Sequence, residues 1–328
     1  MQIDINPIQD DGLTSCLDDL IQSIGLWSGK DFRLMYLDSW KFVFADLAKI
    51  RNNFWDRSEI SSRLYFDDEL KSWYYLDKFH GLKFKMQRVK IEETEKIICE
   101  NIDLNRPIIT IYDTYFLKWL DKFYHKEHSW HAILCVGYDK NCYFFNDSRP
   151  FFQLPIKAGI ITQNEFQKGC AGIFITLETH DVQYEYADIY TELAKINFDM
   201  FEAMKKFGVF IQKYAIKRED VENFGGSYGC LIRAIRNIIR GRKHFIECLE
   251  FMIDKYALQE FHEFIIEMNS IIKQWEIIKN LLYKGYLKGN YSQYNVEISR
   301  LVLKCASMEE ALADRLMTVL KLSARGER

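Results

Sequence analysis

The sequence predicts an α+β domain at residues 1–182 followed by an all-α helical bundle at residues 183–328. Short β-branched or aromatic runs bounded by turn residues all fall before residue 180, and such runs are typical of strands. All four prolines, at positions 7, 107, 150 and 155, lie in the first half of the chain. From about residue 185 the apolar residues recur in long segments with the 3.6-residue period of helices.

The first predicted element is a short amphipathic helix in "SCLDDLIQSIG" at 15–25. Thr14 and Ser15 are suitable N-cap residues, and Gly25 is the expected end of the helix. Its apolar residues lie three or four positions apart, which puts them on one face: Cys16, Leu17, Leu20, Ile21 and Ile24.

Two further helices are predicted at about 38–49 and 67–79, before the strands begin. The predicted strands are "RPIITIYD" at 106–113, "AILCVGYD" at 132–139, "CYFFND" at 142–147 and "GIFITLE" at 172–178. "YDKNC" joins the second and third of these strands, and its turn residues favour a hairpin.

The second domain is predicted to contain four or five helices, because amphipathic spacing continues through most of it. The segments are 187–213, 217–223, 227–257, 258–289 and 292–323, with "KGNYS" at 288–292 as one connection. Such a bundle has enough apolar surface to form a homodimer interface.

Composition excludes several classes of function. A net charge of −3, with interspersed acidic and basic residues, argues against a nucleic-acid partner. No apolar run approaches the roughly 20 residues of a membrane span, and "MQIDINPIQDDGL" lacks the features of a secretion signal. The eight cysteines form no CxxC pairs, which indicates reduced thiols in the cytoplasm.

Three histidines, His125, His128 and His131, open the stretch "HKEHSWHAILCVGYDKNCYFFNDSRP" at 125–150. On one side of a helix they would suit zinc. However, no HExxH motif is present, no fourth ligand stands at a recognisable spacing, and the stretch runs directly into a strand. We therefore expect no metal site, and simple loop histidines are the other alternative.

A nucleophilic site is the third interpretation of this stretch. Cys16 lies at a predicted helix N-terminus, where unpaired N–H groups and the helix dipole favour a thiolate. His131 begins one strand and Asp147 ends the next, so an antiparallel hairpin would bring them together. A thiol, an imidazole and an orienting carboxylate form the catalytic apparatus of papain-type enzymes.

The motifs carry a resemblance to a known family. "SCLDDLIQSIG", "SW" at 39–40, "RPIITIYDTYFLKW", "FYHKEHSWHAILCVGYD" and "FFND" resemble the N-terminal domain of the butirosin-biosynthesis acyltransferase family (BtrH type). The sequence is more distantly similar to C39 and papain-like cysteine peptidases and to papain-fold amide synthetases of thiotemplated biosynthesis. The resemblance covers about residues 9–178 and implies a papain-like cysteine-protease fold with an antiparallel sheet and an N-terminal helix.

The resemblance also assigns roles to individual residues. It implies that Cys16 is the nucleophile, His131 the general base and Asp147 its orienting partner. The family's second histidine, acid and tyrosine match a set of substrate-pocket candidates: His128, Asp113 and Tyr115. His125 has no recognised counterpart.

The oxyanion donor departs from the family pattern. Papain-like enzymes place a glutamine about six residues before the cysteine, where this chain has Asp10, with Gln9 one residue earlier. An ionised Asp10 would repel the oxyanion, so Gln9 or backbone N–H groups are the candidate donors.

The expected function is a cysteine-dependent acyltransferase or amide synthetase of secondary-metabolite biosynthesis. Cys16 would take an acyl group from a carrier-protein thioester and pass it to a small-molecule amine. The chain would need no cofactor of its own, because phosphopantetheine would be attached to the acyl or peptidyl carrier protein. A C39-like cysteine peptidase or amidase and a non-catalytic papain-fold binding protein are the alternatives.

Overall fold

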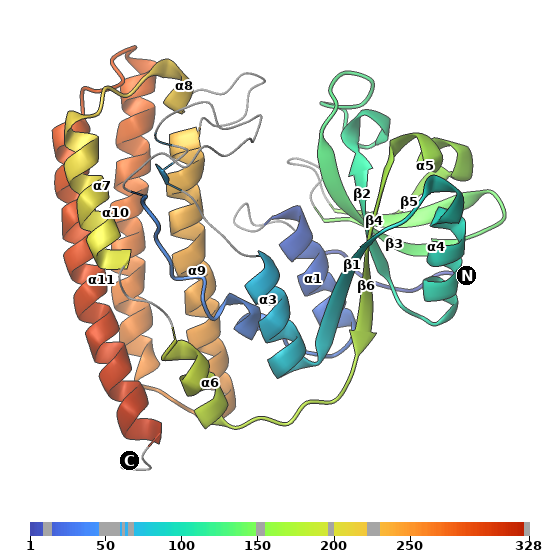
Figure 1. Cartoon of the computed structure of the whole chain (residues 1–328), viewed down its shortest axis with the longest axis horizontal. Helices are drawn as coiled ribbons and strands as arrows, with labels where there is room; N and C mark the ends of the chain where they lie inside the picture. The colour runs from blue at the N-terminus through green and yellow to red at the C-terminus, as the bar shows by residue number, and fades with distance from the viewer. Residues whose placement is uncertain are drawn as a thin grey trace. The chain divides into compact units, whose positions relative to one another are not determined.

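The computed structural model describes residues 1–8, 15–45, 60, 63–64, 69–148, 155–195, 200–221 and 230–324. The chain forms two compact units (Figure 1), one of Met1–Phe32 with Trp73–Gln183 and one of Arg33–Ser72 with Tyr184–Arg328. The change of unit after Gln183 falls one residue from the expected domain boundary. Segment 33–72 differs from the expectation, because it belongs with the helical unit and interrupts the first one.

The first unit is built on a six-stranded antiparallel sheet with the order β1-β6-β2-β3-β4-β5. The strands are β1 Leu82–Arg88, β2 Ile108–Asp113, β3 Trp130–Tyr138, β4 Cys142–Asp147, β5 Ile156–Thr162 and β6 Cys170–Thr179. The four predicted strands correspond to β2, β3, β4 and β6, and the hairpin between β3 and β4 is present. The two strands that were not predicted, β1 and β5, are the edges of the sheet, where few positions are buried and the apolar pattern is weak.

The helices of the first unit cover this sheet. In Figure 1, α1 (Cys16–Trp27) lies on one side of it, and α4 (Thr94–Asp103) and α5 (Gln163–Gly169) lie on the other. Phe166 of α5 stacks on Tyr112 and Phe145, and these rings form the aromatic core. The predicted end of α1 at Gly25 was wrong: the helix continues to Trp27, and Gly29 adopts the left-handed conformation beyond it.

The chain is thus a mixed α/β protein with more helix than sheet among its described residues, compatible with the predicted α+β class. The helix predicted at 67–79 is present as α3 (Glu69–Tyr75) and a π-helical turn, η2 (Leu76–His80). Short 3₁₀ turns occur at η1 (Arg33–Tyr36), η3 (Ile91–Glu93) and η4 (Thr114–Phe116).

The second unit is helical. Its helices are α6 Tyr186–Leu193, α7 Met200–Lys213, α8 Arg218–Val221, α9 Cys230–Tyr256, α10 Phe261–Leu287 and α11 Asn295–Ala324. Over the described residues these elements agree with the predicted segments, except that 187–213 is divided into α6 and α7 by a turn after Leu193. Residues 196–199, 222–223 and 227–229 of those segments lie outside the described ranges. No helix in the described part of the chain combines the length and apolarity needed to cross a bilayer.

The prediction of a helix at 38–49 was wrong for residues 38–45, which form no helix. Residues 46–49 lie outside the described ranges. Trp40, Phe42 and Phe44 are buried while the residues between them are less so, which is the period of an extended chain. Phe42 packs against Phe207 of α7 and Trp275 of α10. Tertiary packing into the bundle therefore decides the conformation of this segment.

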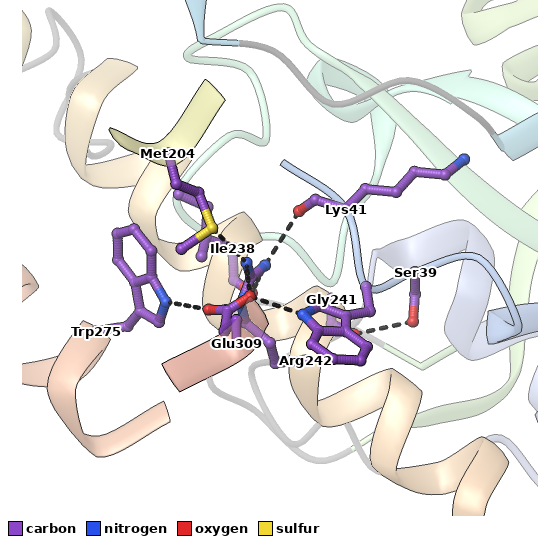
Figure 2. Close-up of polar contacts among 9 residues, drawn as sticks. Ser39, Lys41, Met204, Ile238, Gly241, Arg242, Trp275 and Glu309 are labelled. Carbon is purple, nitrogen blue, oxygen red and sulfur yellow. Dashed lines mark hydrogen bonds and ion pairs between the residues drawn. The ribbon is translucent and has the colours of Figure 1, made fainter. Parts of the chain in front are cut away.

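A buried ion pair fastens the extended segment to the bundle (Figure 2). Arg242 of α9 contacts Glu309 of α11 at 2.6 Å, and both side chains are fully buried. The indole N–H groups of Trp40 and Trp275 donate to the same carboxylate at 2.7 and 3.0 Å, and Arg242 also donates to the carbonyl of Lys41. Because the carboxylate receives donors at both oxygens, its burial is compensated.

Candidate active site

Cys16 is the first residue of α1. Ser15 is the N-cap, as predicted: its hydroxyl accepts the Asp18 N–H at 3.1 Å, and the Asp18 carboxylate accepts the Ser15 N–H at 3.0 Å. This capping box gives the N–H groups of Ser15 and Asp18 their acceptors. The N–H groups of Cys16 and Leu17, which lie between them, have no acceptor among the described residues. The thiol thus sits at the electropositive end of a helix.

The β3–β4 hairpin brings His131 to Asp147. The imidazole Nε2 lies 3.0 Å from the carboxylate Oδ1, and the two side chains are 4% and 1% exposed. Regular pairing between the strands starts only at Leu134 and Asn146, so both residues lie beyond the paired part of the ladder. Since Nε2 is engaged, Nδ1 is the ring nitrogen left for another partner.

That partner is the Cys16 thiol, which hydrogen-bonds with the imidazole of His131. Burial alone would raise the pKa of Cys16, but the His131 charge and hydrogen bonds from His131 and the Ala132 backbone lower it below 9.0. Burial lowers the pKa of His131, yet Asp147 and Cys16 outweigh it and raise this pKa to about 10. The favoured resting state is therefore a thiolate beside an imidazolium.

Trp119 completes the site, although the sequence predicted no role for it there. Its indole N–H donates to Asp147 Oδ2 at 2.8 Å, while His131 occupies Oδ1. The indole packs on Gly159 of β5, where a Cβ would lie 2.9 Å from the ring. Trp119 ends the motif "RPIITIYDTYFLKW", but it lies 28 residues from Asp147 and no spacing rule links the two side chains, so the contact was not predicted.

The other two histidines belong to a separate cluster. His128 Nδ1 lies 2.6 Å from Asp113 Oδ2, and its ring stacks on Tyr115 with 4.3 Å between centroids. His125 stacks on the same tyrosine at 5.2 Å. The pocket candidates Asp113, Tyr115 and His128 thus lie together, although not in contact with the Cys16 thiol in any described interaction.

The three histidines do not converge on one point, since His131 and His128 each pair with a different aspartate. Within the described ranges, no group of three or more His, Cys, Asp or Glu side chains is placed to hold a metal ion. Gln9, the candidate oxyanion donor, and Asp10 lie outside the described residues.

Thiol, imidazole, carboxylate and indole form one chain of contacts that starts at a helix N-terminus. Such an arrangement can generate a nucleophilic thiolate, return a proton to a leaving group and keep the imidazole in one orientation. No protein-family model and no curated protein matches the chain.

Proposed function

We propose that this protein is a papain-like cysteine acyltransferase that forms an amide from a carrier-protein thioester and a small-molecule amine. The observation that carries the proposal is the contact chain Cys16–His131–Asp147, in which the pKa of the thiol is lowered and that of the imidazole is raised. What distinguishes this buried pair from a structural one is that one member is a thiol at a helix N-terminus beside an imidazole held by a carboxylate, which is the arrangement that activates a cysteine as a nucleophile.

In the first half-reaction the Cys16 thiolate attacks the thioester carbonyl. The developing oxyanion is stabilised by the N–H groups of Cys16 and Leu17, which have no acceptor among the described residues, and one such donor is worth about 3 kcal/mol of barrier. The tetrahedral intermediate then expels the carrier thiolate, which takes the proton of the His131 imidazolium. The products are an acyl-Cys16 thioester, a free carrier thiol and a neutral His131.

In the second half-reaction the amine nitrogen attacks the acyl-Cys16 carbonyl, and the carbon–sulfur bond breaks with its electron pair on sulfur. Neutral His131 takes a proton from the attacking nitrogen, which restores the imidazolium beside the Cys16 thiolate. Asp147, held by Trp119, keeps the ring oriented through both halves. The resemblance of the motifs to biosynthetic acyltransferases favours an amine over water as the acceptor.

Intact-protein mass spectrometry tests the proposal. Wild-type protein incubated with acyl-phosphopantetheinyl carrier proteins is expected to gain the mass of one acyl group, and Cys16→Ala is expected to gain none. Cys142→Ala is the matched control, because it removes another half-buried thiol of the first unit. An adduct that persists in Cys16→Ala would refute the mechanism, and release as free acid in the presence of amines would favour a peptidase or amidase.

A further inference from the structure

The chain has a second Asp–His pair, and this one is open to solvent. The His128 side chain is 68% exposed, against 4% for His131. Asp113 is held in place, because its Oδ1 accepts the Tyr115 N–H at 3.0 Å while Oδ2 faces His128 Nδ1 at 2.6 Å. The imidazole is thus fixed at Nδ1 by a carboxylate and on its face by the Tyr115 ring, at an interplanar angle of 7°. Nε2 has no protein partner among the described residues, which is the geometry of an oriented base.

The two pairs lie at the same end of the sheet. Asp113 ends β2 and is the register partner of Trp130, the residue that precedes His131 on β3. The backbone N–H of Thr114 donates to the carbonyl of Ser129 at 2.8 Å and closes this end. His128 and His131 are three residues apart, so their Cα atoms are separated by at most roughly 11 Å, the reach of an extended chain.

The proposed transfer releases a proton that His131 cannot accept. An alkyl amine with a pKa near that of lysine, about 10.4, is almost wholly an ammonium ion at pH 7. Forming the amide from an ammonium ion releases two protons from nitrogen. His131 is neutral after acylation and takes only one of them, so the other needs a different acceptor.

We propose that His128, oriented by Asp113 and Tyr115, takes the first proton from the ammonium form of the acceptor amine. This inference rests on the proposed acyl transfer and names the acceptor class, a primary alkyl amine that arrives protonated. His128 Nε2 accepts the first proton, the freed nitrogen lone pair attacks acyl-Cys16, and His131 accepts the second proton. The carbon–nitrogen bond forms as the carbon–sulfur bond breaks, and the exposed His128 then releases its proton to solvent.

Two nucleophiles distinguish a base from a merely structural residue. The 328-residue chain is acylated with the butyryl thioester of N-acetylcysteamine. The loss of acyl-Cys16 is then followed by mass spectrometry with ethylamine or hydroxylamine as the acceptor. Hydroxylamine is largely unprotonated at neutral pH and has no extra proton to lose. In His128→Gln, transfer to ethylamine is expected to fall roughly 100-fold, the lower end of the range for general-base catalysis, while transfer to hydroxylamine stays within about twofold.

His125→Asn is the matched control, because it alters the other imidazole on Tyr115 and asparagine tolerates the positive φ of 55° at this position. It is expected to behave as wild type with both nucleophiles. Equal rates for His128→Gln and wild type with ethylamine, or equal losses with both nucleophiles, would overturn the role of His128 and leave the acyl transfer standing. Failure of wild type to form acyl-Cys16 with any thioester would overturn the proposed function itself, and this inference with it.

Discussion

Replacing His131 with alanine is expected to raise the pKa of the Cys16 thiol from below 9.0 to above it. The pKa rises because burial raises it in the wild type, and the charge and hydrogen bond of His131 are the main effects that lower it. An adjacent opposite charge lowers the pKa of an acid by about 1–3 units, which corresponds to about 1.4–4 kcal/mol. Removing it leaves a thiol with its burial penalty and only the Ala132 N–H and the helix terminus to offset that penalty.

The assay is the rate of alkylation of Cys16 by iodoacetamide as a function of pH, with peptide mapping to separate it from the other cysteines. Because the thiolate is the reactive form, the midpoint of the rate profile reports the pKa of the thiol. In His131→Ala we expect the midpoint to rise, and the rate at pH 7 to fall by up to roughly 1,000-fold, because only the part of the rise above pH 7 lowers the thiolate fraction. His128→Ala is the control, since that imidazole pairs with Asp113 and should leave the midpoint unchanged. An unchanged midpoint in His131→Ala would refute the ion pair and with it the proposed resting state.

Three further substitutions test how the site and the bundle are held. Trp119→Phe keeps a ring but removes the N–H donor to buried Asp147, so it should destabilise the first unit by about 1.5–3 kcal/mol in urea unfolding; an unchanged midpoint would contradict the role of the indole. Arg242→Leu leaves the Glu309 charge buried without its cation and should cost about 3–5 kcal/mol, part of which the double variant with Glu309→Leu recovers. If the double variant is less stable than Arg242→Leu alone, the expected recovery fails, and the ion pair itself stabilises the bundle. Gly241→Ala would place a Cβ 2.3 Å from the carbonyl oxygen of Ser39 in the extended segment. It should lower the free energy of unfolding by about 1–3 kcal/mol, measured by thermal unfolding. A neutral effect would show that the extended segment shifts freely.

Local patterns were sufficient for much of the fold. Ser15 was recognised as a cap because a hydroxyl before an apolar-periodic stretch satisfies orphan N–H groups at close range. The strands β2, β3, β4 and β6 were found because they carry dense β-branched and aromatic residues, and the positions of His131 on β3 and Asp147 on β4 predicted their meeting. The papain-type order of cysteine, histidine and aspartate predicted that Cys16, at the start of α1, would join them. The cap and strand signals each lie within a few consecutive residues, and the His131–Asp147 contact lies within one hairpin.

The remaining features were decided only by tertiary structure. Segment 38–45 has a composition that also suits a helix, and it is extended because Trp40 and its neighbours are buried in a bundle formed mostly by residues after 184. Trp119 orients Asp147, and Arg242 pairs with Glu309 67 residues away, through contacts that no spacing rule describes. The physical reason is the same in each case: periodicity records which side of an element is buried, whereas a single polar contact between distant elements depends on where the packed elements place two side chains. The sequence by itself therefore predicted that Cys16, His131 and Asp147 would meet, with a hairpin joining the last two, and the packing determined what holds them in place.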